Sequence, residues 1–167
     1  YLPYMEESKR VQNIIANAMD TSLDLRPPNI KSIIDANPGV STWTGKELPL
    51  GYLDWWPVCL GFNNLEPPFD DPEVRRAVNY AIDREQLVKI GWQGAGTSSH
   101  LPLPNFPPIR KYTDGIQDLI NKYEIGVYDP AKTAEILQRK GWSKDGEGFW
   151  SKGGERLTMV VDIFGIF

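Results

Sequence analysis

Residues 70–91 carry the sequence feature that most restricts the fold, an amphipathic helix with a marked beginning. Asp70 or Asp71 offers a capping carboxylate, Pro72 falls near the first turn, and Glu73 favours the positive end of the helix dipole. The apolar residues that follow recur at helical spacing: Val74, Ala77, Val78, Ala81, Ile82 and Val88. Such a stripe faces a core, and 167 residues are enough to bury one.

The rest of the chain indicates a mixture of helices and strands. Apolar spacing and proline or glycine boundaries predict further helices over 6–19, 27–34, 116–123 and 129–140, the last closed by Gly141. Strands are predicted over 21–25, 40–43 and 58–63, with a hairpin over 149–163. The proline-rich stretch 98–112 predicts an irregular loop. Because strands and helices do not alternate regularly, the pattern favours an α+β fold, a mixed sheet flanked by helices.

Composition excludes several classes of function. The net charge is −4 and acidic and basic residues are interleaved, which argues against nucleic acid and against a polybasic membrane-surface patch. One cysteine and one histidine do not supply a zinc site of the usual Cys/His types, and no cofactor or metal is expected. No membrane span or signal peptide is evident, and the apolar run 160–167 leads us to expect a piece of a longer protein.

Catalytic constellations are weak. A nucleophilic pair of Cys59 and His100 lacks a local signature, and Cys59 falls in the predicted strand over 58–63, where cysteine behaves as a small hydrophobe. The segment 98–100, Ser-Ser-His, has no nucleophile elbow, and Gly94-Ala95-Gly96 follows a helix where a phosphate cradle would precede one. Helix capping explains Asp70-Asp71 better than paired catalytic carboxylates.

The aromatic segment 52–63 is a candidate for ligand contact. Tryptophan offers a flat apolar face and one N–H donor, which suits stacking on sugar rings or on ligand side chains. If Trp55 and Trp56 lie in an alternating segment, one of them points away from the core. Core packing and a contact between lobes are the alternatives.

The segment 67–88, PPFDDPEVRRAVNYAIDREQLV, closely resembles family 5 of the extracellular solute-binding proteins. The resemblance continues, in the family's order, through Leu60–Asn63, Tyr128–Lys132, Gly141-Trp142, Gly148–Trp150 and Leu157–Met159, and it covers most of the chain. Two features depart from the family pattern: residues 106–124 resemble an insertion, and Trp55-Trp56-Pro57 is not a general family feature.

The resemblance implies one lobe of a two-lobed, type II periplasmic-binding-protein-like fold, with residues 1–167 as a single domain forming most of the second lobe. It implies the substrate-binding component of an ABC importer, which encloses a small polar solute, a sugar or a short peptide, and delivers it to a membrane permease. The protein would be a non-enzymatic monomer, periplasmic or extracellular, and compatible with a lipid anchor in its full-length form.

Six residues near predicted strand ends or turns are the candidate ligand contacts: Asp24, Arg26, Trp55, Trp56, Phe62 and Asn63. The six tryptophans of the chain slightly favour a saccharide as the solute. A carboxylate and an arginine placed around a zwitterion would instead indicate a peptide. Two alternatives from other classes stay open, a thiol-dependent enzyme using Cys59 and His100 and a protein-interaction lobe without a small-molecule ligand.

Overall fold

The structure is a computed structural model that describes residues 5–51, 58–103 and 107–163. These residues form seven helices and three short strands. The chain divides into two compact units. The first contains residues 1–58 and 84–125, and the second contains residues 59–83 and 126–167.

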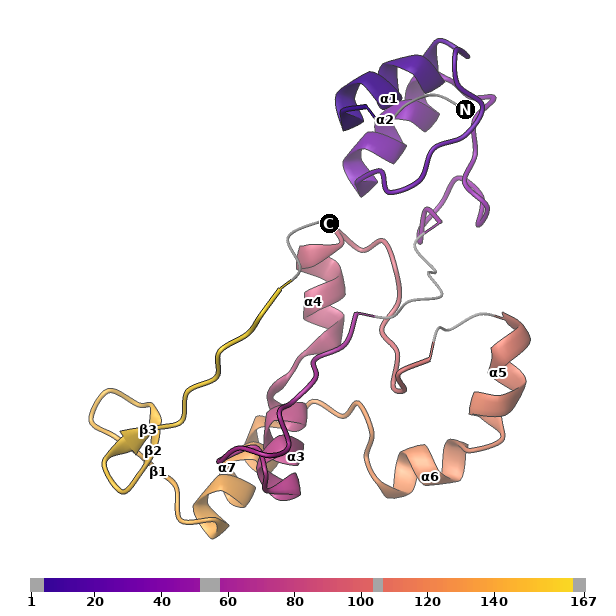
Figure 1. The fold of residues 1–167 in the computed structure, drawn as a ribbon. Helices are drawn as coiled ribbons and strands as arrows, with labels where there is room; N and C mark the ends of the chain where they lie inside the picture. Colours follow the sequence, from indigo (N-terminus) through magenta and orange to yellow (C-terminus); the bar gives the residue numbers. More distant parts are fainter. Residues whose placement is uncertain (1–4, 52–57, 104–106, 164–167) are drawn as a thin grey trace. The chain divides into compact units, whose positions relative to one another are not determined.

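The first unit begins with a pair of packed helices, α1 (Glu7–Ile15) and α2 (Pro27–Ala36) (Figure 1). Their shared core contains Ile14, Leu25 and Ile33, and the hydrophobic side chains packed around it are Val11, Ile15, Met19, Ile30 and Val40. Asn37 closes the pair, because its side-chain amide donates to the carbonyl of Ile15, 3.2 Å away, at the end of α1. Apolar spacing and this polar closure explain why the predicted helices form here.

The remaining helices of the first unit are short: α4 (Arg84–Gly91), α5 (Pro107–Asp114) and α6 (Gln117–Lys122). Two hydrogen bonds hold the middle of the loop after α4. The hydroxyl of Ser98 donates to Glu85 of α4, and Nδ1 of His100 lies 3.1 Å from the carbonyl oxygen of Ile125. His100 therefore has a structural hydrogen bond in this loop.

The second unit is built on α3 (Pro72–Ala81) and α7 (Pro130–Arg139). Its buried core contains Val74, Ala77, Tyr80, Ile136 and Leu137. Two polar contacts set the register of the helices. The hydroxyl of Thr133 donates to the carbonyl of Ala77 at 3.0 Å, and the amide of Asp129 donates to the carbonyl of Tyr80 at 2.8 Å. Apolar stripes and internal hydrogen bonds thus hold the two helices together.

Charged side chains join the same two helices at one end. The ammonium of Lys140 lies 2.8 Å from Asp71 and 2.7 Å from Glu73, and Arg139 lies 2.5 Å from Glu73. Hydrogen bonds from Lys140 hold the pKa of Asp71 and the pKa of Glu73 below their ordinary values. In turn, the hydrogen bond to Asp71, followed by that to Glu73, raises the pKa of Lys140. We call Asp71, Glu73, Arg139 and Lys140 the α3–α7 ion cluster.

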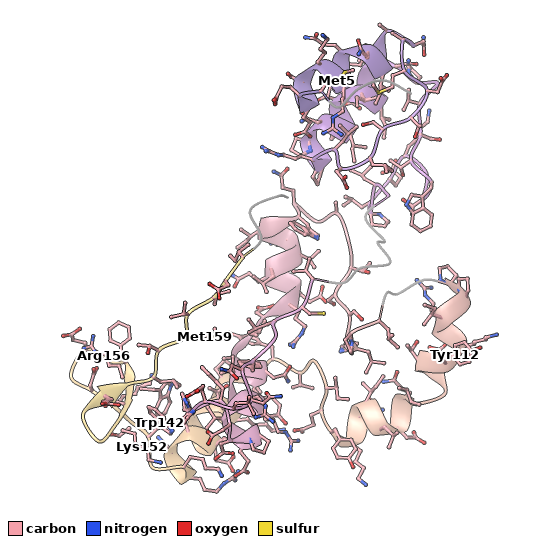
Figure 2. The ribbon with its side chains drawn as sticks, in the orientation of Figure 1. Met5, Tyr112, Trp142, Lys152, Arg156 and Met159 are labelled. Carbon is pink, nitrogen blue, oxygen red and sulfur yellow. The ribbon has the colours of Figure 1, made fainter. Side chains whose placement is uncertain are left out.

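A small antiparallel sheet follows α7, with the strands β1 (Ser143–Lys144), β2 (Trp150–Lys152) and β3 (Glu155–Arg156) in that order. Gly141 links the helix to the sheet at φ +83°, as expected of a left-handed helix cap. Figure 2 shows Trp142 and Lys152 near this junction and Arg156 on the sheet. Lys152 donates to the carbonyl of Lys140 at 2.9 Å, so the sheet is tied to the end of α7.

The α+β prediction is confirmed at the level of helices combined with a small sheet, but several predicted elements are wrong. The helix over 70–91 is two helices, because Ile82 has an extended conformation at ψ 111°. The loop predicted over 98–112 contains the start of α5 at Pro107, where proline suits the first helical turn.

The strand predictions fail more widely. Residues 21–25 and 58–63 form no strand, the strand over 40–43 is reduced to a bridge between Thr42 and Gly45, and the hairpin's second strand ends at Arg156. A strand requires a neighbour that accepts and donates backbone hydrogen bonds. None of the described segments pairs with 58–63 or 158–163. The prediction of a single domain forming most of a second lobe stays a prediction.

Candidate functional site

Asp24 and Arg26 lie in the loop that joins α1 to α2. Asp24 is exposed and has φ 53°, in the left-handed region that aspartate tolerates better than most residues. The guanidinium of Arg10 holds the loop by donating to the carbonyl of Leu23 at 2.5 Å and to the hydroxyl of Ser22 at 3.2 Å. The Asp24 carboxylate is therefore presented to solvent on a fixed backbone.

Arg26 is the N-cap residue of α2, and Glu7 of α1 holds its backbone. The amide of Arg26 donates to Glu7 Oε1 at 2.6 Å, and its Nε lies 3.3 Å from Glu7 Oε2. Burial acts to raise the pKa of Glu7, but hydrogen bonds from Arg26 and Asn29 outweigh it and hold that pKa below its ordinary value. The side chain of Arg26 is 82% exposed, so most of its donors face water.

Phe62 and Asn63 lie in the second unit, in the segment that leads towards α3. The Phe62 ring is half-buried, with its centroid 5.2 Å from that of Phe69. The side-chain oxygen of Asn63 accepts from the amide of Leu65 at 3.1 Å, which shapes a local turn. Phe62 thus packs locally, while Asn63 is exposed.

The structure brings the predicted contacts together only in two local pairs. Asp24 and Arg26 share the first unit, and Phe62 and Asn63 share the second. Trp55 and Trp56 lie outside the described residues. Whether these six residues bind a ligand stays a prediction.

The placement of Cys59 corrects one prediction. Cys59 is exposed and lies in no strand, because its segment has no pairing partner among the described residues. His100 belongs to the other compact unit and is engaged with the carbonyl of Ile125. Cys59 therefore does not behave as a small buried hydrophobe.

Sequence reasoning passed over Trp43, an exposed aromatic side chain in the first unit. The signal that could have found it is Thr42-Trp43-Thr44-Gly45, in which a glycine two residues after a large aromatic residue allows a tight turn. Within the described ranges, no cluster of three or more histidine, cysteine or acidic side chains is placed to hold a metal ion. No helix of those ranges has the length and apolar character needed to cross a membrane.

Comparison with known proteins identifies the class. Residues 1–161 match the family described as "Bacterial extracellular solute-binding proteins, family 5 Middle". The chain therefore belongs to family 5 of the bacterial extracellular solute-binding proteins, as the sequence motifs indicated. No solved structure gives a significant match.

Three curated relatives illustrate what the chain is similar to. Heme-binding protein A of Haemophilus influenzae is 35% identical over 126 residues, which are 74% of this chain and 20% of that protein. The glutathione-binding protein GsiB of Pectobacterium atrosepticum is 37% identical, over 50% of this chain and 14% of its own length. The dipeptide-binding protein of Escherichia coli K12 is 34% identical, over 51% and 14%. The chain thus matches a fifth or less of the length of these relatives.

Proposed function

We propose that the complete gene product is the substrate-binding component of an ABC importer. The observation that carries the proposal is the family match over residues 1–161. Two lobes exchange between open and closed arrangements, and a solute favours the closed one because only there do both lobes contact it. The closed protein then delivers the solute, chemically unchanged, to a membrane permease.

The proposed solute is a short peptide or a peptide-like molecule. Relatives named for binding glutathione, dipeptides and di- or tripeptides support this class. Asp24 and Arg26 add an exposed carboxylate and an exposed guanidinium, which are the charges that the two ends of a zwitterion require. A saccharide is the second candidate, favoured by the six tryptophans of the chain.

Membership of the family supports the remaining parts of the proposal. Residues 1–167 contribute most of one lobe of a two-lobed, type II binding-protein fold, and the complete protein acts as a monomer. The family description as extracellular supports a periplasmic or extracellular location, to which a lipid anchor would add retention at the membrane. The partners are the solute and the permease.

Calorimetry on the complete gene product tests the solute class, with glutathione, the dipeptide Gly-Phe and cellobiose as probes. Binding of a peptide probe without turnover is the expected result, and binding of cellobiose alone would show that the saccharide reading is right. Asp24→Asn removes the charge and keeps a residue that tolerates positive φ. It is expected to weaken peptide binding, whereas Asp20→Asn, at an exposed position between the same helices, leaves it unchanged. Equal peptide affinities of the two variants would show that the charge of Asp24 does not contribute to binding.

Labelling of the thiol would not test the alternative of a thiol-dependent enzyme. Because Cys59 is exposed, prompt alkylation is expected whether or not the thiol is catalytic. Cys59→Ser is the sharper variant: unchanged solute binding supports a transport protein. Turnover of a bound peptide that disappears in Cys59→Ser would establish the enzyme instead.

A further inference from the structure

We draw no further inference here: the strongest candidate, the surface patch of exposed apolar side chains that α5, α6 and the turn between them carry (Tyr112, Ile116 and Leu119), supports no proposal because nothing in the part of the chain that the structure describes shows what covers it.

Discussion

At the scale of single residues, carboxylates that cap helices explain where the second unit's helices begin. The side chain of Asp71 accepts from the amide of Glu73 at 2.9 Å, and that of Asp129 accepts from the amides of Ala131 and Lys132 at 3.0 and 3.1 Å. In both helices proline occupies the next position, where its missing N–H is not needed. The same two devices therefore define both helix starts.

Replacing Asp129 tests this explanation. Asp129→Ala leaves two amides of the first turn of α7 without their acceptor, and we expect the free energy of unfolding to fall by about 0.5–2 kcal/mol. Urea denaturation of the complete gene product provides the measurement. Asp114→Ala, at an exposed aspartate at the end of α5, is the control and should change stability little. A loss no larger than that of the control would contradict the capping role.

Individual residues also show what the sequence alone could decide. It predicted a cap from Asp70 or Asp71, and the structure selects Asp71 because its carboxylate reaches the Glu73 amide. It predicted burial of Cys59 from apolar neighbours, which fails because burial depends on a partner segment that local sequence does not specify. The role of a side chain that bonds to the backbone nearby in the sequence is therefore more predictable than the burial of a side chain.

At the scale of elements, the contact between α3 and α7 is the main packing interaction of the second unit. Leu137 is among its largest fully buried side chains. Leu137→Ala removes methyl groups and leaves a cavity, so the free energy of unfolding is expected to fall by about 2–5 kcal/mol. Leu87→Ala, at an exposed leucine of α4, should change it by less than about 0.5 kcal/mol. Chemical denaturation with fluorescence detection compares the two, and similar small losses would mean that the α3–α7 core contributes little.

The α3–α7 ion cluster predicts how stability depends on pH. Hydrogen bonds from Lys140 lower the pKa of Asp71 and of Glu73 in the folded protein. The unfolded carboxyls therefore bind protons first as the pH falls, and the folded state loses this contribution. It is fully present about one pH unit or more above the ordinary carboxyl pKa values, where the unfolded carboxyls are ionised, and is lost as the pH falls through their lowered folded values.

Urea midpoints measured from neutral to acidic pH check this direction. Lys140→Met removes the main donor to both carboxylates and should flatten the acid limb of the profile. Lys31→Met breaks an exposed ion pair with Asp35 in α2 and should leave the limb unchanged. An acid limb of equal steepness in both variants would show that the cluster does not set the pH dependence.

The success of prediction differs between helices and strands for a physical reason. A helix forms its backbone hydrogen bonds within one segment, so apolar spacing and caps were enough to predict α1, α2, α6 and α7. A strand satisfies its backbone on another segment, and the apolar pattern over 58–63 and 157–163 does not name one. Only the hairpin, whose partners are adjacent in sequence, formed a ladder as predicted, and over fewer residues.

At the scale of the whole molecule, the family could be recognised from sequence while the solute could not. The motif over 67–88 forms α3 and most of α4, and it carries a cap, core residues and ion-pair partners that hold the helices together. Asp24, a proposed solute contact, lies in a loop that Arg10 holds, and the local sequence does not specify such a contact. The helices thus carry the family motif, whereas the assignment of the solute to loop residues is a proposal.

The apolar segments without ladder partners lead to a prediction for the isolated 167-residue chain. Val58 is 84% exposed, Val160 90% and Ile163 83%, and the backbone over 158–163 pairs with no described segment. Figure 2 places Met159 in this segment beyond the sheet. A segment of this kind is a template for pairing with another chain.

We therefore expect the isolated chain to associate with itself at micromolar concentration in sedimentation velocity. Val160→Lys places a charge in the segment, which opposes edge-to-edge pairing, and should shift the chain towards monomer. Leu87→Lys, at an exposed leucine of α4, is the control for added charge and should not. If Val160→Lys and Leu87→Lys reduce association equally, association is due to general surface hydrophobicity. If the wild-type chain is monomeric at high concentration, the segment 158–163 does not pair with another chain. Because pairing needs only a free backbone edge and apolar neighbours, the complete gene product should not associate if another of its strands occupies that edge.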